Sequence, residues 1–340
     1  MQKKNLSIVE LAKHLGVSKS TVSSVLNGKT KERRISEETR KIILDYIEQS
    51  GFRPNALARS LRTGKSKIIG MLVEDVANPF FAEVSHLVEQ KLAKLGYRIL
   101  LSSTENDNEN AAEAIATFQE RQVEGYIIVP PTDLSEVIKQ DILTNSPCVI
   151  FDRMVNGLNV CSVQIDNYNS MTTATRHLIN NGYQHIAFVT IKSDQMQMTD
   201  RLRGYKETIR QGLLKTFILK VDRRNSVDEI KKNIANFLLA YPQLDAVIFA
   251  TNYIALIGMQ VLKMRGLNAP EKIGVIGFDD SPYYMLMTPS VTSIVQPVSQ
   301  IAEGIVELLL LQLQNGSNTR RPHTLCFNCE LIERESTVRT

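Results

Sequence analysis

The chain has 340 residues, of which 43% are hydrophobic and 22% are charged, and it contains no tryptophan. This composition is typical of a globular protein with two or three domains that bury cores without disulfides, and it excludes a disordered or low-complexity chain. The N-terminal segment lacks the apolar run of a signal peptide, and no later segment approaches a membrane span, so we expect a cytoplasmic protein.

The formal net charge of +4 is distributed unevenly along the chain. Residues 1–67 carry 15 Lys or Arg and 6 Asp or Glu, a net charge of +9, whereas the remaining residues carry a net charge of −5. A basic module attached to a mildly acidic one suits a protein that neutralises DNA phosphates. A solvated basic surface is the alternative, so the arrangement of helices has to decide between the two interpretations.

The first residues predict two short helices joined by a tight turn. Ser7 and Glu10 have capping-box spacing before a helix over about 8–15, and the glycine that follows ends this helix. Ser18 is placed to cap a second helix over 19–26. A three-residue connection that contains glycine is typical of a helix-turn-helix, whose second helix enters the DNA major groove. A plain helical hairpin is the alternative.

The outward face of the second helix carries a lysine and small hydroxyl side chains, which suit close approach to DNA. These residues are Lys19, Ser20, Ser23 and Ser24. Ser36 predicts the cap of a third helix that ends at Gly51. Beyond it, a cationic helix over about 56–61 is too short to be stable alone. We therefore expect it to be ordered only when it packs on DNA and on a second copy of the chain.

The segments LAKHLGVSKSTVSSVLNG (11–28) and GFRPNALARSL (51–61) resemble the N-terminal module of the LacI/GalR (lactose-repressor/galactose-repressor) family of bacterial transcription regulators. The resemblance implies a homodimer on a palindromic double-stranded DNA operator, with Leu61 of each hinge helix wedged into the central base step. It places base-reading positions at Lys19, Ser20 and Ser24, and Ser24 departs from the arginine of many members. The expected DNA-binding residues are Ser18, Lys19, Ser20, Thr21, Ser23, Ser24, Asn27, Asn55, Ala58, Arg59 and Leu61.

From residue 67 onward, apolar runs of strand length alternate with amphipathic helices. The first set of helices is expected over about 81–95, 111–121 and 134–143. The alternation resumes after Asp166, with helices expected to 179 and over about 201–211, 227–240 and 254–265. Strands that are apolar on both faces predict parallel sheets covered by helices on both sides. Because the alternation appears twice, we expect two doubly wound lobes with a ligand cleft at the carboxyl ends of their strands.

Polar residues follow several of these strands and are candidates for lining the cleft. They are Asp75, Asn78, Asp152, Arg153, Asp166, Thr251, Asn252, Asp279 and Asp280. Carboxylates, amides and an arginine suit a hydroxylated ligand, because each sugar hydroxyl both donates and accepts hydrogen bonds. For any one of these residues, a role as helix cap or turn former is the alternative.

The resemblance to the family continues through this region. It rests on NPFF (78–81), IDN (165–167), RLRGY (201–205), GFDD (277–280) and PSVTSIVQP (289–297). It implies the fold of periplasmic sugar-binding proteins and a sugar or sugar derivative as effector, with a nucleobase or nucleoside as the second choice. Phe81 would pack on a ring face, while Arg201 and Asp279 would hold polar groups. Tyr253 departs from the aspartate common in the family. The expected effector-binding residues are Phe81, Asp152, Arg201, Asn252, Asp279 and Gln296.

The expected fold is a small all-α helix-turn-helix DNA-binding domain followed by an α/β periplasmic-binding-protein-like domain of two doubly wound parallel-sheet lobes. The DNA-binding domain is expected over 1–52, the hinge helix and linker over 53–66, and the effector-binding domain over 67–340. Within the effector-binding domain, lobe 1 is expected over about 67–165 and 294–325, and lobe 2 over about 166–293 and 326–340.

Signals of enzymatic chemistry are poor. The chain has no nucleophile elbow, no phosphate loop and no H-E-x-x-H, and its five histidines are scattered, so we expect no catalytic residues, no cofactor and no metal site. The C-x-x-C pair Cys326 and Cys329 leaves zinc or redox chemistry as an alternative to a plain strand.

The main prediction is a sequence-specific transcriptional regulator, a repressor, whose operator affinity is controlled allosterically by a small metabolite. The metabolite either releases or promotes DNA binding, depending on which arrangement of the lobes it prefers. The alternative is a cytosolic small-molecule-binding protein or a sugar-transforming enzyme with a helical appendage.

Overall fold

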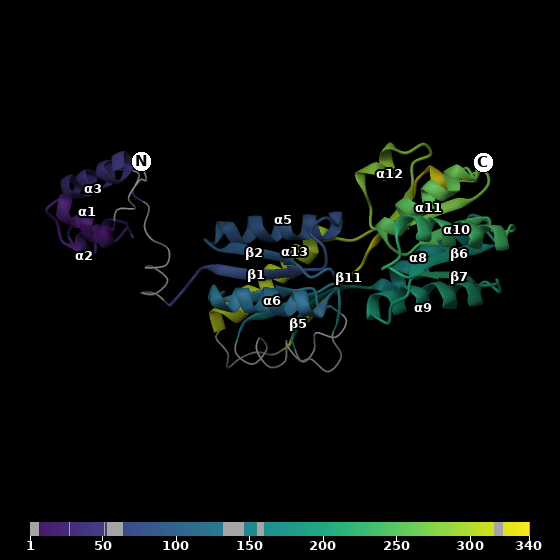
Figure 1. Ribbon diagram of the computed structural model, residues 1–340, viewed down its shortest axis with the longest axis horizontal. Helices are drawn as coiled ribbons and strands as arrows, with labels where there is room; N and C mark the ends of the chain where they lie inside the picture. Colours follow the sequence, from purple (N-terminus) through teal and green to yellow (C-terminus); the bar gives the residue numbers. More distant parts are fainter. Residues whose placement is uncertain are drawn as a thin grey trace. The chain divides into compact units, whose positions relative to one another are not determined.

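The computed structural model in Figure 1 describes residues 7–26, 28–50, 52, 64–131, 146–154, 160–315 and 322–339. The chain divides into two compact units, Met1–Lys67 and Ile68–Thr340. The helices predicted over 56–61 and 134–143 lie outside the described residues. In the part of the chain that is described, no helix is both long enough and apolar enough to cross a bilayer.

The first unit contains three helices, α1 (Ile8–His14), α2 (Lys19–Leu26) and α3 (Glu37–Ser50). Each contributes one fully buried side chain to a common core, formed by Leu11, Val22 and Ile43. These residues come from the apolar faces that the helical spacing predicts. The fold prediction for this unit, a small helix-turn-helix, is confirmed.

The predicted caps set the ends of α1 and α2. Ser7 Oγ accepts a hydrogen bond from the Glu10 amide at 3.2 Å, and Glu10 Oε2 accepts one from the Ser7 amide at 2.8 Å. Gly16 then adopts a left-handed φ of 63°, which costs glycine little and turns the chain toward α2. Ser18 Oγ accepts a hydrogen bond from the Thr21 amide at 3.0 Å at the start of α2.

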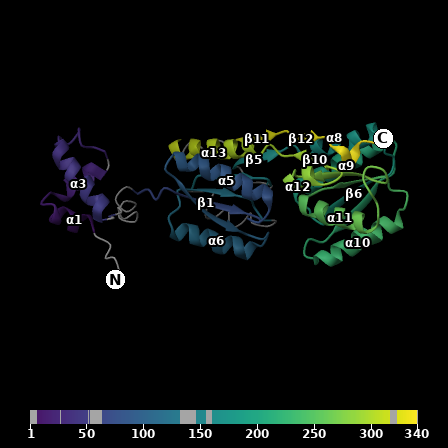
Figure 2. The ribbon, with the colours of Figure 1, turned by 90° about the horizontal axis from the view of Figure 1, so that it is seen from above.

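The first lobe of the second unit is built on a parallel sheet in the order β11-β5-β4-β3-β1-β2. The strands are β1 (Ile68–Val73), β2 (Arg98–Ser103), β3 (Gly125–Ile128), β4 (Cys148–Phe151), β5 (Cys161–Ile165) and β11 (Thr324–Phe327). Figure 2 shows α5 (Pro79–Lys94) and α13 (Val298–Asn315) on one face and α6 (Asn108–Glu120) on the other. Both faces are therefore covered, as the continuous apolar strands predict.

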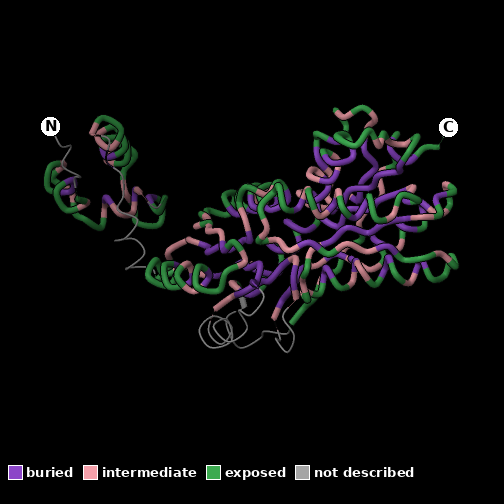
Figure 3. The backbone as a smooth tube through the Cα atoms, turned by 45° about the vertical axis from the view of Figure 1, so that its right-hand side comes forward, coloured by how far each residue is buried: buried purple, intermediate pink, exposed green. Residues whose placement is uncertain are grey.

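The second lobe repeats this arrangement around a sheet in the order β12-β10-β9-β8-β6-β7. The strands are β6 (Ile186–Ile191), β7 (Phe217–Val221), β8 (Ala246–Phe249), β9 (Gly274–Phe278), β10 (Thr292–Val295) and β12 (Glu330–Ile332), and β12 runs antiparallel to β10. Helices α8 (Asn167–Asn180) and α9 (Met196–Gln211) pack on one face, and α10 (Val227–Ala240) and α11 (Asn252–Met264) cover the other. Figure 3 shows that the buried residues follow the strands through the interior.

Within the described residues the chain passes between the lobes at three places: after β5, after β10, and between β11 and β12. β10 stays in the second sheet to Val295, and β11 stays in the first sheet to Phe327. These crossings come about two residues later than the expected lobe boundaries at 294 and 326. The reason is that sheet pairing continues to the last residue of each strand, with Phe327 opposite Ile165.

Several helices begin earlier than predicted. α9 begins at Met196 rather than at Arg201, α5 at Pro79 and α11 at Asn252. The residue before α9, Gln195, makes no side-chain cap hydrogen bond. Ser193 and Asp194 precede it, and Ser193 Oγ accepts a hydrogen bond from the Gln195 amide at 3.2 Å rather than from an amide of the helix. The sequence does contain a signal for the start of α5, because Asn78 caps the helix and a proline follows it.

Candidate functional site

The exposed face of α2 is narrower than predicted. Lys19 and Ser20 are exposed, whereas Ser23 and Ser24 are half-buried. α2 is short, and its buried Val22 packs into the core that it shares with α1 and α3. Only the first turn of α2 is therefore fully exposed to solvent. The first turn is the part of a recognition helix that reaches base edges.

Hydroxyl groups are connected at the N-terminus of α2. Ser18 Oγ lies 2.7 Å from Ser20 Oγ and 2.8 Å from Thr21 Oγ1. This N-terminus also carries the positive end of the helix dipole and unpaired amides, which favour an anion such as a phosphate group. The arrangement therefore offers hydroxyl donors and a lysine on one exposed turn. The other expected DNA-binding residues lie outside the described residues, namely Asn27, Asn55, Ala58, Arg59 and Leu61.

The second unit contains a cleft of ≈ 990 Å³ between its two lobes. The lining comes from the carboxyl ends of strands in both sheets, the position at which open parallel sheets bind ligands. The structure brings all six expected effector-binding residues together around this cleft: Phe81, Asp152, Arg201, Asn252, Asp279 and Gln296.

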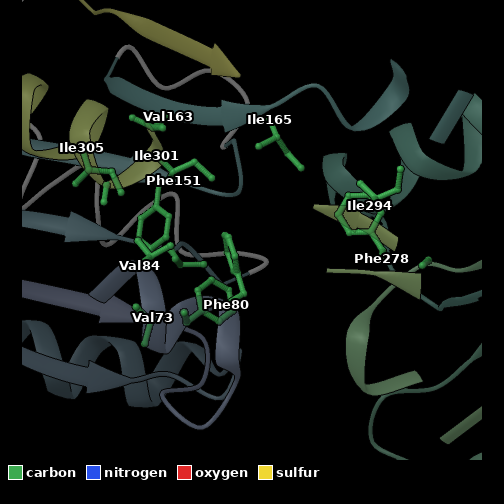
Figure 4. Packing of buried hydrophobic residues seen from close by; sticks show 14 of the residues in the cluster. Val73, Phe80, Val84, Phe151, Val163, Ile165, Phe278, Ile294, Ile301 and Ile305 are labelled. Atoms are coloured by element: carbon green, nitrogen blue, oxygen red, sulfur yellow. The ribbon is translucent and has the colours of Figure 1, made fainter. Parts of the chain in front are cut away.

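Asp152 and Asp279 occupy equivalent positions in the two lobes. Each follows a phenylalanine that ends a strand, and each adopts a left-handed φ of 66°. Aspartate tolerates this conformation better than most residues, because its short polar side chain bonds locally. Figure 4 shows the phenylalanines that precede them, Phe151 in the first lobe and Phe278 beside Ile294 in the second. The ring of Phe151 packs edge-on against Phe81, with ring centroids 6.2 Å apart.

Arg201 is fixed in place by its own chain. Its Nε donates to Asn167 Oδ1 at 2.8 Å, and its Nη1 donates to the Ala250 carbonyl at 2.6 Å. The guanidinium also lies 3.4 Å from the ring centroid of Phe278, a cation–π contact, and the residue is only 3% exposed. A guanidinium held in this way is preorganised, so little side-chain entropy is lost when it receives a ligand.

The two cleft aspartates have raised pKa values because they are buried. Burial raises the pKa of Asp152 to about 7, a net value in which the Arg201 guanidinium opposes the rise and the charge of Asp279 adds to it. Burial also raises the pKa of Asp279, opposed by Arg201 and by the hydrogen bond that Gln296 Nε2 donates to Asp279 Oδ1 at 2.6 Å. Asp152 therefore titrates near neutral pH and serves as donor or acceptor toward a hydroxyl.

Polar contacts join the lobes across the cleft. Asn252 Nδ2 donates to Asn78 Oδ1 at 3.1 Å. Gln195 Nε2 donates to Asn106 Oδ1 at 3.2 Å. Glu74, at the end of β1, forms ion pairs with Arg153 of its own lobe and with Arg223 of the second lobe.

Two of the polar residues that follow strands have structural roles. Asp166 caps α8 by accepting a hydrogen bond from the Asn169 amide at 2.8 Å, and Asp280 is held by Arg334 at 2.8 Å. Neither lines the cleft.

The sequence analysis missed Glu74 and Arg223, which do line the cleft. Glu74 directly follows β1, so its position at a strand end was a usable signal. Arg223 follows β7, which was expected only as a weak strand.

The C-x-x-C pair forms no disulfide and does not stand in one strand. Cys326 lies on β11 of the first sheet, and Cys329 precedes β12 of the second. Burial raises the pKa of Cys329 to about 11, which disfavours the thiolate that zinc binding and redox exchange require. Among the described residues, no group of three or more His, Cys, Asp and Glu side chains could hold a metal ion.

A helix-turn-helix unit joined to a two-lobed parallel-sheet unit with a polar cleft defines a ligand-responsive DNA-binding regulator. Residues 7–55 match the family model described as bacterial regulatory proteins, lacI family, and residues 175–337 match the periplasmic binding protein-like domain. The chain is 30% identical to the ribose operon repressor of Halalkalibacterium halodurans over 91% of this chain and 90% of that protein. The chain therefore belongs to the lacI family of bacterial regulatory proteins, as the resemblance predicted.

Solved structures agree with this fold. The lac repressor dimer bound to operator and the anti-inducer ONPF has a TM-score of 0.86 at 21% identity, covering 99% of this chain and 100% of that one. A periplasmic binding protein/LacI transcriptional regulator from Alkaliphilus metalliredigens, complexed with D-xylulofuranose, has a TM-score of 0.67 at 27% identity. It covers 80% of this chain and all of that chain. The predicted α/β architecture of two lobes is confirmed.

Proposed function

We propose that this regulator is a repressor that binds a palindromic operator as a homodimer, and that a carbohydrate or carbohydrate derivative in the cleft controls its affinity for DNA. The observation that carries the proposal is the cleft itself: all six residues that the family resemblance assigns to effector binding line one cavity. They come from segments as distant in the sequence as Phe81 and Gln296.

On the DNA side, we assign base readout to Lys19 and Ser20, which are exposed on the first turn of α2, and to the half-buried Ser24. Lysine reaches the acceptor atoms of guanine, and hydroxyls contact phosphates or either kind of base. Ser18, Thr21 and Ser23, together with Asn27, complete the surface as phosphate-contacting or supporting residues.

The hinge assignment rests on the sequence. We assign residues 1–52 to the DNA-binding domain, 53–66 to the hinge and 67–340 to the effector-binding domain. In the hinge, Asn55, Ala58 and Arg59 would contact the minor groove, and Leu61 would wedge into the central base step. An apolar wedge partly unstacks the step and bends the duplex, which lets more protein surface contact DNA.

In the cleft, we assign Phe81 to the apolar face of a sugar ring, and Arg201 with Asp279 to its hydroxyls. The fixed guanidinium and the carboxylate held by Gln296 present directional groups of opposite charge. Asn252 and Gln296 complete the hydrogen bonding from the second lobe, and Asp152 does so from the first. The D-xylulofuranose complex of the Alkaliphilus protein and the name of the ribose operon repressor support a carbohydrate here.

Dimer formation is supported by an apolar surface on the second lobe. Tyr283, Met285 and Leu286 of the short helix α12 (Pro282–Leu286) are 61%, 67% and 81% exposed. Large apolar side chains gathered on one surface are typical of an interface. A second copy of the chain would cover them, as a twofold operator requires.

Control of DNA binding follows from linkage between the two sites. A ligand that favours one lobe arrangement by a few kcal/mol shifts the hinge and the operator affinity by the same factor. The three passages of the chain between the lobes, among the described residues, are the segments that a lobe rotation moves. A ligand that prefers the DNA-binding arrangement of the lobes promotes operator binding, and a ligand that prefers the other arrangement releases the operator.

A selection of DNA fragments on the full-length protein tests the proposal. We expect enrichment of a palindromic sequence whose affinity changes when sugars are added. Failure to enrich any sequence above nonspecific DNA at physiological salt would contradict it. Replacement of Lys19 or Ser20 should change the preferred bases, rather than weaken binding to every sequence alike.

A further inference from the structure

The cleft is lined by a group of residues with as many carboxyl groups as arginines, and the charges of this group balance when all three carboxyl groups are ionised. Three carboxylates, Glu74, Asp152 and Asp279, line it together with three arginines, Arg153, Arg201 and Arg223. Glu74 pairs with both Arg153 and Arg223, Arg153 Nε lies 3.3 Å from Asp152 Oδ2, and Arg201 interacts with both aspartates.

Each of these arginines already interacts with a carboxylate of the group: Arg153 and Arg223 pair with Glu74, and Arg201 is attracted by the charges of the two aspartates, although Arg153 Nε has no hydrogen-bond partner among the described residues. Glu74 and Arg153 are each 7% exposed, and Arg201 is 3% exposed and held by Asn167 and the Ala250 carbonyl. An anion that drew an arginine away from its carboxylate would leave that carboxylate buried and unpaired. Breaking an ion pair in this way costs far more free energy in the protein interior than at the surface. The same argument applies to a cation that draws Asp152 or Asp279 away from Arg201.

Outside this group of six, acidic side chains outnumber basic ones around the cleft: Asp75, Glu105, Asp107, Asp194 and Asp222 stand against Lys192 and Arg224. Asp75 accepts a hydrogen bond from the Ala77 amide, and Asp107 caps α6, so both satisfy backbone groups and pair with no cation of the described chain. Asp194 and Glu105 also line the cleft and form no ion pair within the described ranges. Arg224 is already bound by Asp222 at 3.2 Å. The field of these side chains therefore repels an anion.

A second feature points to a polar ligand without charge. Gln197 lines the cleft, is 4% exposed, and its Oε1 has no hydrogen-bond partner in the described part of the chain. A buried acceptor without a partner is costly, and a ligand hydroxyl would satisfy it. A ligand hydroxyl is uncharged, so it can bind here without breaking the ion pairs among Glu74, Asp152, Asp279 and the three arginines.

We propose that the effector is an uncharged polyhydroxylated molecule, and that the cleft rejects its phosphorylated, carboxylated and amino derivatives. This inference rests on the carbohydrate effector proposed above and narrows it by charge. The network of Glu74, Asp152, Asp279 and the three arginines determines this selectivity. A charge carried by the ligand would have to compete with the members of the network for a partner of opposite charge.

Calorimetric titration of the full chain with matched compounds tests this inference. The probes are D-ribose and D-glucose, their phosphates ribose 5-phosphate and glucose 6-phosphate, the acids ribonate and gluconate, and glucosamine as its ammonium form. We expect a neutral sugar to bind and each charged counterpart to bind roughly 100-fold more weakly, the scale of breaking one buried ion pair.

The outcomes separate the inference from the proposed function. A phosphate, acid or ammonium derivative that binds within tenfold of its neutral parent would overturn the inference and leave a carbohydrate effector standing. Binding of a nucleobase with no binding by any sugar or derivative would contradict the carbohydrate effector, and the inference would fall with it.

Two variants with opposite signs test the network directly. Glu74→Gln removes one negative charge, and Arg223→Gln, at a side chain 33% exposed, removes one positive charge. We expect Glu74→Gln to improve the binding of the acid relative to the neutral sugar by roughly tenfold, and Arg223→Gln to do the same for the ammonium form. Glu113→Gln, on the exposed face of α6, is the control and leaves selectivity unchanged. Equal selectivity in all three variants would overturn the proposal.

Discussion

Asn252 of the second lobe donates a hydrogen bond to the same Asn78 oxygen that caps α5 in the first lobe. Asn78 Oδ1 accepts from Asn252 Nδ2 at 3.1 Å and from the Phe80 amide at 3.1 Å. One side-chain oxygen therefore links the start of α5, which carries Phe81, to the start of α11. The same oxygen atom therefore caps α5 and takes part in a contact between the two lobes.

A double-mutant cycle measures the strength of this link. Asn252→Ala removes the contact between the lobes and the hydrogen bond that Asn252 Oδ1 accepts from the Tyr253 amide at 2.7 Å. Asn78→Ala removes the same contact and the cap of α5, and loss of this cap should cost about 1 kcal/mol. We expect the two effects on the free energy of unfolding to be coupled by roughly 0.5 to 1.5 kcal/mol. Asn78→Asp keeps the acceptor oxygen and serves as the control. Additive effects in urea denaturation would show that the contact contributes nothing to stability.

Gly204 sets the distance between α8 and α9. A Cβ at this position would lie 2.4 Å from the Tyr168 carbonyl oxygen, which belongs to the backbone of α8 and cannot move alone. We expect Gly204→Ala to destabilise the second unit by roughly 1 to 3 kcal/mol. Because Arg201 lies on α9 and its partner Asn167 on α8, ligand affinity should fall as well.

Gly212→Ala is the matched control for this substitution. There the added Cβ would meet the flexible end of Ile179 at 3.2 Å, which has room to adjust. Thermal unfolding followed by circular dichroism compares the two variants. Equal melting temperatures would mean that the close approach of α8 and α9 is not needed for stability.

The sequence indicated which residues line the cleft better than it indicated the ion pairs among them. Residues such as Asp152 and Asp279 were found because a strand-end position is visible in the order of apolar runs. The pairing of Glu74 with Arg223 was not found, because it joins the end of β1 to the residues after β7. Only the folded lobes bring these two charges together, and no periodicity in the sequence encodes that contact.

Helix starts show the same limit. The first helices were predicted closely because the Ser7–Glu10 capping box and the Ser18 cap are local signals. The start of α9 was missed by five residues because Gln195 supplies no side-chain cap. Tertiary packing against α8, rather than a local signal, determines this start.

The stability of the second unit should depend on pH through Asp152. Its pKa rises from 3.8 to about 7 in the folded protein, so between these values the folded state keeps a proton that the unfolded chain has lost. Stability from this group is complete below pH 3.8 and is lost as pH rises to about 7. Asp152→Asn should remove this loss, gaining roughly 2 to 4 kcal/mol relative to the native protein as pH rises through that range.

Asp222→Asn is the control for this pH dependence. Hydrogen bonds from Arg224 lower the pKa of Asp222, so its contribution has the opposite sign and is lost only in acid. Urea denaturation at several pH values compares the variants. A constant difference between Asp152→Asn and the native protein from acid to neutral pH would contradict the raised pKa.

The first turn of α2 should separate stability from DNA recognition. Ser18→Ala removes the cap and should destabilise α2 by about 1 kcal/mol, visible as faster hydrogen exchange of its amides in the full chain. Ser20→Ala leaves the hydrogen bond from the Thr21 amide to Ser18 in place. We expect it to change the base preference with little change in exchange. Identical DNA selections for Ser20→Ala and the native protein would remove Ser20 from the base-reading surface.

The central claim is that the cleft between the lobes controls binding to DNA. Fluorescence anisotropy of a selected operator, titrated with the full chain with and without the sugar it binds, tests this most directly. The account predicts that the sugar shifts operator affinity by roughly 5- to 150-fold, the usual range of such coupling. It also predicts that Asp279→Ala binds the operator normally without sugar and shows no shift. An operator affinity that stays constant at saturating sugar in the native protein, or a full shift in Asp279→Ala, would contradict the account.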